Sequence, residues 1–223
     1  MRAPDDDRTL AWRVIAFFVG LVWDLCFRTR VARSSRVPRT GAAVVAGNHL
    51  SALDGVLLGL VVNRRRKRMV RFLSGAEFFE RRRIGWALKA CRQIPVRRGR
   101  RDLGALDEAI RALRQGSLAG IFPEGKVNAG LELQRGKRGV ARIALAAGAP
   151  VVPVGIWGTQ FRWPRSGLHW RRPWRPTVAV TFGEPIQPTG EATSPHDLAR
   201  FVAEIMAGIA EQVDAARALA ESR

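Results

Sequence analysis

Short apolar runs of strand length alternate with stretches of helical periodicity along most of the chain. Residues 42–46 form an unbroken apolar run that predicts a buried strand, and a helix is expected over 53–62. After Asp102, apolar residues recur with the 3.6-residue period of an amphipathic helix, which Gly116 ends. Further strands are expected at 68–73, 93–96, 118–122, 151–157 and 177–182, and further helices at 84–92, 136–147 and from Ser194 onward. Strands that alternate with helices predict an α/β sandwich, in which helices flank a largely parallel sheet.

The N-terminal segment has a different character. Residues 10–27 read LAWRVIAFFVGLVWDLCF, and we expect a helix over 10–30. Its uninterrupted apolar core, 14–23, has ten residues, whereas a membrane-spanning helix needs about 20. Acidic residues precede it and no small-residue cleavage site follows, so a signal peptide is not expected. We predict that residues 1–39 form a membrane-interface helix with a basic connector and that residues 40–223 form one domain; a helix packed on the domain core is the alternative.

Positive charge dominates the composition. There are 38 lysine and arginine residues against 19 aspartate and glutamate residues, which gives a net charge of +19. Basic runs occur at 64–68, 81–83 and 97–101. Such a charge favours an anionic partner, either a nucleic acid or an anionic bilayer, although a generally arginine-rich, solvated surface is also possible. The runs at 64–68 and 81–83 contain no interleaved aromatic residues, so we expect a membrane surface and no nucleic acid.

Two polar motifs follow predicted strands. The first, GNHLSALDG, places His49 five positions before Asp54. Imidazole is the usual general base near neutral pH, and an aspartate can orient its ring, so the pair could remove a proton from a hydroxyl group. The second, FPEG at 122–125, places a glutamate at a strand end, where clefts of α/β folds open. A structural His–Asp hydrogen bond and a turn-capping glutamate are the alternatives. The three histidines are scattered, so no metal site is expected.

Together with IPVRRG at 94–99 and VPV at 152–154, these motifs resemble the ordered blocks of glycerolipid acyltransferases of the 1-acylglycerol-3-phosphate (lysophosphatidate) acyltransferase type. The resemblance covers residues 40–185 and implies that His49 and Asp54 are catalytic. The substrate-binding residues that it implies are Asn48, Arg98, Phe122, Pro123, Glu124, Gly125, Lys126, Lys137 and Pro153. Arg98 would clamp the phosphate of the acceptor, with Lys137 as a second clamp and Pro153 shaping the cleft wall. The family usually continues FPEG with Thr-Arg-Ser, whereas this chain has Lys126, Val127 and Asn128, so Lys126 replaces the missing charge or the acceptor differs.

The resemblance implies transfer of a fatty acyl group from a thioester to a lysophospholipid hydroxyl, with 1-acyl-sn-glycerol-3-phosphate giving phosphatidate in phospholipid biosynthesis. No cofactor is expected beyond the co-substrate, acyl-CoA or acylated acyl carrier protein. Other acceptors within the family are glycerol-3-phosphate, a lyso-ornithine lipid or a glycolipid. A basic module that binds nucleic acid or membrane without catalysis is the alternative of a different class. We expect peripheral or monotopic attachment to the cytoplasmic face of the cell membrane.

Overall fold

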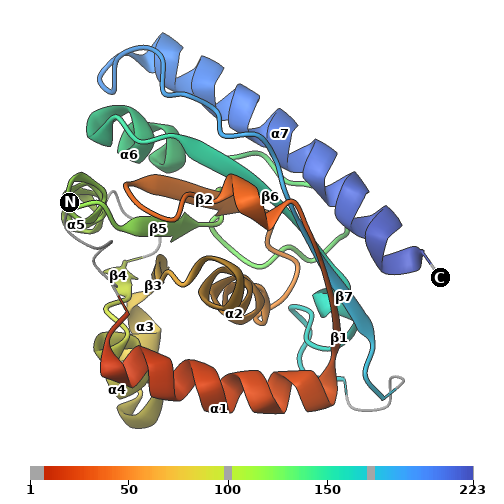
Figure 1. Ribbon diagram of the computed structural model, residues 1–223. Coiled ribbons are helices and arrows are strands. Elements are labelled where there is room, and N and C mark those ends of the chain that lie inside the picture. The colour runs from red at the N-terminus through yellow and green to blue at the C-terminus, as the bar shows by residue number, and fades with distance from the viewer. Residues whose placement is uncertain (1–7, 98–101, 170–173, 223) are drawn as a thin grey trace.

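The computed structural model describes residues 8–97, 102–169 and 174–222. One sheet of seven strands runs through the molecule in the order β1-β7-β6-β2-β5-β3-β4 (Figure 1). The strands are β1 (Arg28–Ala32), β2 (Ala43–Gly47), β3 (Val70–Gly75), β4 (Ile94–Val96), β5 (Leu118–Ile121), β6 (Val151–Trp157) and β7 (Thr177–Phe182). All neighbours pair in parallel except β6 and β7, which are antiparallel. The predicted α/β sandwich around a largely parallel sheet is therefore confirmed.

Helices cover both faces of this sheet (Figure 1). One face carries α1 (Leu10–Cys26) and α2 (Asp54–Arg66), and the other carries α5 (Leu103–Arg114), α6 (Gly139–Ala147) and α7 (Pro195–Glu221). The short α3 (Ala76–Phe79) and α4 (Arg82–Ala90) connect β3 to β4, and single 3₁₀ turns are η1 (Ser34–Arg36) and η2 (Thr159–Phe161). Alternate residues of β2 enter the two cores, Val45 on the α2 face and Val44 on the α5 face. Because both faces are buried, the central strands are apolar throughout, which is why the sequence shows them as unbroken runs.

The N-terminal segment enters the sheet, contrary to the expected division at residue 39. The predicted helix over 10–30 ends at Cys26, since Phe27 has extended backbone, and the expected connector begins instead with β1. This strand pairs with β7 from Arg28 opposite Thr177 to Ala32 opposite Thr181. Its sequence, RTRVA, lacks an apolar run because β1 is a half-exposed edge strand, so hydrophobicity did not reveal it.

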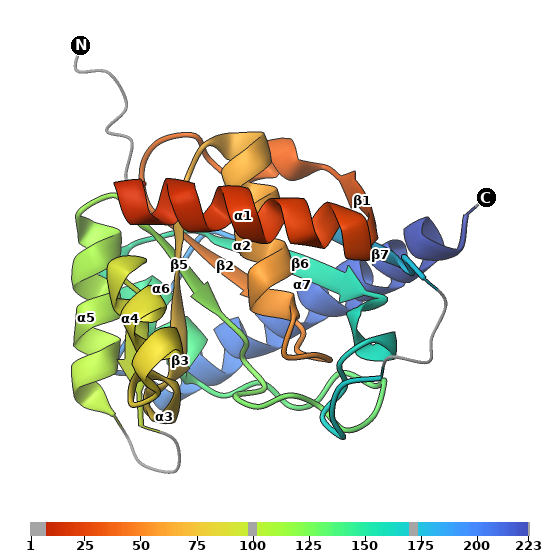
Figure 2. The same cartoon turned by 90° about the horizontal axis from the view of Figure 1, so that it is seen from below.

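The first helix lies across the outer side of α2 (Figure 2). Its buried residues are Ala16, Gly20 and Trp23, and the indole of Trp12 donates a hydrogen bond to Asn63 Oδ1 of α2 at 3.2 Å. Large apolar side chains point away from the protein on the opposite side of the helix. Within the described ranges, no helix combines the length and the apolar character that a membrane crossing requires.

The long C-terminal helix packs directly on β6, and glycine makes this close approach possible. A Cβ atom on Gly155 would lie 1.9 Å from the carbonyl oxygen of Gln212 in α7, which is far inside a van der Waals contact. The ring of Pro153 lies against Gly208 of the same helix, where a Cβ atom would be 3.1 Å from Pro153 Cγ. Backbone contact without intervening side chains therefore fixes the position of α7 on β6.

We predict that Gly155→Ala lowers the free energy of unfolding by about 1–3 kcal/mol, because overpacking forces β6 and α7 apart. Gly104→Ala is the matched control, since its Cβ atom would meet only Asp102 Oδ1 at 3.6 Å. Within helix α5 this control should be neutral or raise stability by about 0.5–1 kcal/mol. Chemical denaturation of both variants measures the difference, and a Gly155→Ala protein as stable as wild type would contradict the packing described.

Candidate active site

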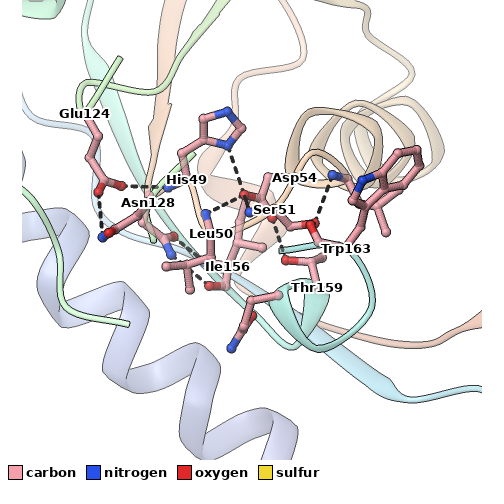
Figure 3. Close-up of polar contacts among 12 residues, drawn as sticks. His49, Leu50, Ser51, Asp54, Glu124, Asn128, Ile156, Thr159 and Trp163 are labelled. Atoms are coloured by element: carbon pink, nitrogen blue, oxygen red, sulfur yellow. Dashed lines mark hydrogen bonds and ion pairs between the residues drawn. The ribbon is translucent and has the colours of Figure 1, made fainter. Parts of the chain in front are cut away.

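The two polar motifs meet at one edge of the sheet. His49 follows the end of β2, and Glu124 follows the end of β5, which is the parallel neighbour of β2. Parallel strands bring their carboxyl ends to the same edge, where open α/β folds place their sites. Figure 3 shows the carboxylates of Asp54 and Glu124 on either side of the His49 backbone.

The imidazole of His49 is bonded to the carboxylate of Asp54. Nδ1 of the ring lies 3.0 Å from Asp54 Oδ2. The Asp54 side chain is fully buried, and that of His49 is 13% exposed. An ionised carboxylate can only accept hydrogen bonds, so Nδ1 carries the ring hydrogen and Nε2 presents its lone pair. No residue in the described part of the chain hydrogen-bonds to Nε2, which leaves this atom available to a substrate hydroxyl.

Asp54 is held by four donors. Oδ2 also accepts hydrogen bonds from the backbone N–H groups of Leu50 at 2.7 Å and Ser51 at 2.8 Å, and Oδ1 accepts from Thr159 Oγ1 at 2.6 Å. Asp54 is the first residue of α2, where the helix dipole favours a negative charge. These donors satisfy the buried carboxylate, and its orientation fixes that of the imidazole. The contact of Thr159 with Asp54 could not be predicted from the sequence, because Thr159 lies in η2, after β6, and belongs to neither motif.

The ring of His49 also stacks on an aromatic residue of the second motif. Its centroid lies 4.2 Å from that of Phe122, with an interplanar angle of 11°, and Phe72 stacks beyond Phe122 at 5.8 Å. Phe122 thus forms one wall beside the imidazole. Hydrogen bond and stacking together restrict both the position and the plane of the ring.

Glu124 supports the backbone of His49. Its Oε1 accepts a hydrogen bond from His49 N at 2.7 Å, and its Oε2 accepts from Asn128 Nδ2 at 3.1 Å and Gln134 N at 3.2 Å. The side chain is only 4% exposed. Burial raises the pKa of Glu124 above its usual value, although the hydrogen bonds from His49, Gln134 and Asn128 act in the opposite direction. Both oxygens accept hydrogen bonds from protein donors, so in this structure Glu124 holds the backbone of His49 in position.

Asn128 completes the connection between the two motifs. Its backbone N–H donates to the carbonyl of His49 at 2.7 Å, and its side chain bonds to Glu124. The sequence indicated only that Lys126, Val127 and Asn128 depart from the usual Thr-Arg-Ser. In the structure the third of these residues is buried and takes part in the hydrogen-bonded network around His49.

Two residues that the resemblance assigned to substrate binding have structural contacts instead. Asn48 is buried and exchanges two hydrogen bonds with the backbone of Ile156, at 3.0 and 2.8 Å, which fastens the end of β2 to β6. Pro153 lies within β6, and its ring contacts Gly183 and Gly208 beneath α7 rather than forming a wall beside His49. Both residues were assigned from their places in motifs. In the structure, Asn48 joins β2 to β6 and Pro153 packs between β6 and α7.

The remaining predicted residues that the structure describes lie in or beside the FPEG turn. The carbonyl of Pro123 accepts a hydrogen bond from Lys137 N at 2.9 Å. Gly125 has a φ of +75°, and a Cβ atom there would lie 2.5 Å from Lys137 Nζ, so the ammonium group lies directly over this glycine. Lys126 is exposed, and Arg98 lies outside the described residues. Within the described ranges, no three His, Cys, Asp or Glu side chains gather to hold a metal.

The raised pKa of Glu124 predicts a pH dependence of stability. A carboxyl group that binds its proton more tightly in the folded state favours folding at low pH. The free energy of unfolding therefore falls as pH rises from the ordinary pKa of glutamate toward the raised pKa. Glu124→Gln lacks this titration, and it replaces one acceptor oxygen by an NH₂ group that faces backbone or amide donors, which costs about 1–3 kcal/mol near neutral pH. Chemical denaturation across pH should show the wild type losing its advantage over Glu124→Gln as pH rises; a constant difference would contradict the shift.

Comparison with known proteins agrees with this geometry. A family model described as Acyltransferase matches residues 28–157, which contain both motifs. The crystal structure of the 1-acyl-sn-glycerophosphate (LPA) acyltransferase PlsC from Thermotoga maritima superposes with a TM-score of 0.68, at 27% identity over 89% of this chain and 78% of that one. A 1-acyl-sn-glycerol-3-phosphate acyltransferase of Bacillus subtilis is 27% identical over 158 residues, 70% of this chain and 73% of its own.

An uncharacterised protein of Mycobacterium tuberculosis is 32% identical over 149 residues, 62% of this chain and 39% of that protein. The chain thus spans about two fifths of the length of this mycobacterial relative. The family match covers more than half of the chain and includes His49, Asp54 and the FPEG turn. The chain therefore belongs to the acyltransferase family that includes lysophosphatidate acyltransferases.

Proposed function

We propose that the protein transfers a fatty acyl group from a thioester to the hydroxyl of a lysophospholipid, with 1-acyl-sn-glycerol-3-phosphate as acceptor and phosphatidate as product. The observation that carries this proposal is a His–Asp pair in whose hydrogen-bonded network the described residues supply no free hydroxyl. The two hydroxyls in its network are both buried and donate elsewhere, Ser51 to the carbonyl of Trp163 at 2.7 Å and Thr159 to Asp54. The hydroxyl that His49 activates must then come from a substrate.

The reaction needs one proton to move twice. Nε2 of His49 accepts the proton of the acceptor hydroxyl while its oxygen forms a bond to the thioester carbonyl carbon. The carboxylate of Asp54, 3.0 Å from Nδ1, stabilises the imidazolium that results. When the tetrahedral intermediate collapses, the carbon–sulfur bond breaks and Nε2 returns the proton to the leaving thiolate. The products are the ester and a free thiol, from coenzyme A or acyl carrier protein, and the resting state of His49 is restored.

The acceptor's phosphate would be held beside the FPEG turn. Lys137 supports this position, because its ammonium group lies over Gly125, in the turn that carries Glu124. Arg98 is proposed as the main clamp on the strength of its motif alone. The names of the relatives from Bacillus subtilis and Thermotoga maritima support lysophosphatidate as the acceptor. Glycerol-3-phosphate, a lyso-ornithine lipid or a glycolipid remain the alternatives within the same chemistry.

The outward face of α1 supports attachment to a membrane, from which a lysophospholipid would be drawn. Large apolar residues on this face are between 37% and 78% exposed: Leu10, Val14, Phe17, Phe18, Val19, Leu21, Val22 and Leu25. Trp86 of the neighbouring α4 is 65% exposed. A helix with one buried face and one exposed apolar face suits the membrane interface. We place the protein at the cytoplasmic face of the cell membrane, as a peripheral or monotopic protein.

Replacing the proposed base tests the chemistry. His49→Ala should lower the rate of thioester consumption by about 10²–10⁴, because general base catalysis is lost. His196→Ala is the control, since that side chain is 86% exposed at the start of α7, and it should keep the wild-type rate. Ser51→Ala should stay within about tenfold of wild type, since a nucleophile would lose far more. A nearly active His49→Ala protein, or an inactive but folded Ser51→Ala protein, would overturn the assignment.

Steady-state kinetics with varied lysophosphatidate test the acceptor. Lys137→Gln should raise the KM for lysophosphatidate severalfold and leave the KM for acyl-CoA unchanged, because only the acceptor's phosphate loses a charged partner. Arg98→Ala should raise the acceptor KM more, by roughly tenfold or above. Lys89→Gln, an exposed lysine on α4, is the control. Unchanged acceptor KM values, with a phosphate-free lipid acylated well, would contradict lysophosphatidate and leave acyl transfer standing.

A further inference from the structure

A second group of arginines surrounds a groove far from the catalytic pair. The groove has a volume of about 360 Å³ and lies where the ends of α1 and α2 meet the starts of β1 and β7. Its basic residues are Arg28, Arg64, Arg65 and Arg175. Asp54 begins α2 and Arg64 lies ten residues later, so the groove is separated from the catalytic aspartate by about 15 Å along the helix axis. A lipid bound at His49 does not account for this site.

Arg66 and Arg68, near the end of α2, are bound to backbone carbonyls, whereas three of the four groove arginines have no such contact within the described residues. Arg66 donates to the carbonyl of Val37, and Arg68 donates to those of Gly41 and Gly116. By contrast, the guanidinium groups of three groove residues have no hydrogen-bond acceptor and no ion-pair partner among the described residues. These three are Arg28, Arg65 and Arg175.

The fourth groove arginine is paired. Both terminal nitrogens of Arg64 donate to the carboxylate of Asp24 at 2.8 Å. The formal charge of the four arginines and Asp24 is therefore 4 − 1 = +3. The C-terminal ends of α1 and α2 contribute about half a negative charge each, which lowers the attraction for an anion but does not cancel it. A phosphate group complements the positive charge that remains in the groove.

The position of the groove indicates the source of that phosphate. Leu21, Val22 and Leu25, in the last turns of α1 beside it, are 54%, 59% and 58% exposed. Trp174, next to Arg175, is 76% exposed. Both views of the fold show the end of α1 close to the starts of β1 and β7 (Figures 1 and 2). An interfacial helix lies at the level where headgroups meet acyl chains, so guanidinium groups at its end are level with lipid phosphates.

We propose that this groove binds the phosphate of an anionic phospholipid in the bilayer on which α1 rests. The inference depends on the membrane attachment proposed above and adds a headgroup site distinct from the acceptor site. A lipid held there would fix the rotation of the protein on the membrane, because α1 alone allows rocking about its own axis. Of the residues that give the net charge of +19, Arg28, Arg65 and Arg175 would then determine the selectivity for anionic lipid.

Vesicle co-sedimentation of the full chain tests the site. The groove variant changes Arg28, Arg65 and Arg175 together to glutamine. Its control makes the same loss of charge on α5 and α6, across the sheet, by changing Arg111, Arg114 and Arg142 to glutamine. The groove variant should partition about 100-fold more weakly than wild type into vesicles of equal parts phosphatidylcholine and phosphatidylglycerol, as three surface arginines at about 1 kcal/mol each require. The control should lose less than about threefold.

A gain of binding guards against misfolding as an explanation. Asp24→Asn removes the acid from the groove and should strengthen binding to the same anionic vesicles by about fivefold. Asp107→Asn, an exposed acid on α5, is its matched control and should have no effect. Equal losses in the two arginine variants would show that binding follows net charge alone, and no loss in the groove variant would show that its arginines do not contact the lipid; either result would overturn the site.

The test separates this inference from the proposed function. Binding to pure phosphatidylcholine reports on α1 and should be the same in wild type and the groove variant. Acylation of a short-chain, water-soluble lysophosphatidate reports on His49 and should also be unchanged in the groove variant. Conversely, His49→Ala should bind anionic vesicles like wild type. A groove variant that loses soluble turnover as well would place these arginines in the catalytic site and contradict the headgroup assignment.

Discussion

The buried carboxylate of Asp54 is the constraint on which the site depends. A carboxylate without solvent costs several kcal/mol unless donors surround it. Here the donors are the ring of His49, two backbone N–H groups and the hydroxyl of Thr159. They come from the loop after β2 and the turn after β6, so these two segments must lie against the start of α2 for the charge to be tolerated. The orientation of the imidazole follows from that requirement.

Glu124 imposes a second requirement on the same loop. Its carboxylate holds His49 N from the side opposite Asp54, while Asn128 N holds the carbonyl of His49 (Figure 3). The GNHLSALDG and FPEG motifs thus form one hydrogen-bonded unit rather than two independent groups of residues. The hydrogen bonds to both oxygens of Glu124 direct its carboxylate toward the backbone of His49. Lys137 lies beside the same turn, with its ammonium group over Gly125.

The features that could be predicted from the sequence were local contacts and periodic elements. The central strands were predictable because both of their faces are buried, and the contact between His49 and Asp54 was predictable because a single turn connects the two residues. The contacts of Thr159 and Asn48 were not predictable, since they depend on the register of β6 against β2, in which Gly47 lies opposite Val154. The edge strand β1 lacked an apolar run. Part of the basic run at 64–68 also serves the fold, as Arg66 and Arg68 bind backbone carbonyls, which composition alone does not reveal.

In the proposed mechanism the Asp54–His49 pair activates the acceptor directly, and no acyl group is attached to the protein. Rapid mixing with acyl-CoA in the absence of acceptor, followed by denaturing mass spectrometry and a thiol assay, distinguishes this mechanism from a covalent one. We expect an unmodified protein mass and no burst of thiol, with release beginning only when the lysophospholipid is added. A burst equal to the enzyme concentration, together with a mass increase of one acyl group, would contradict it, because both are signatures of a covalent intermediate.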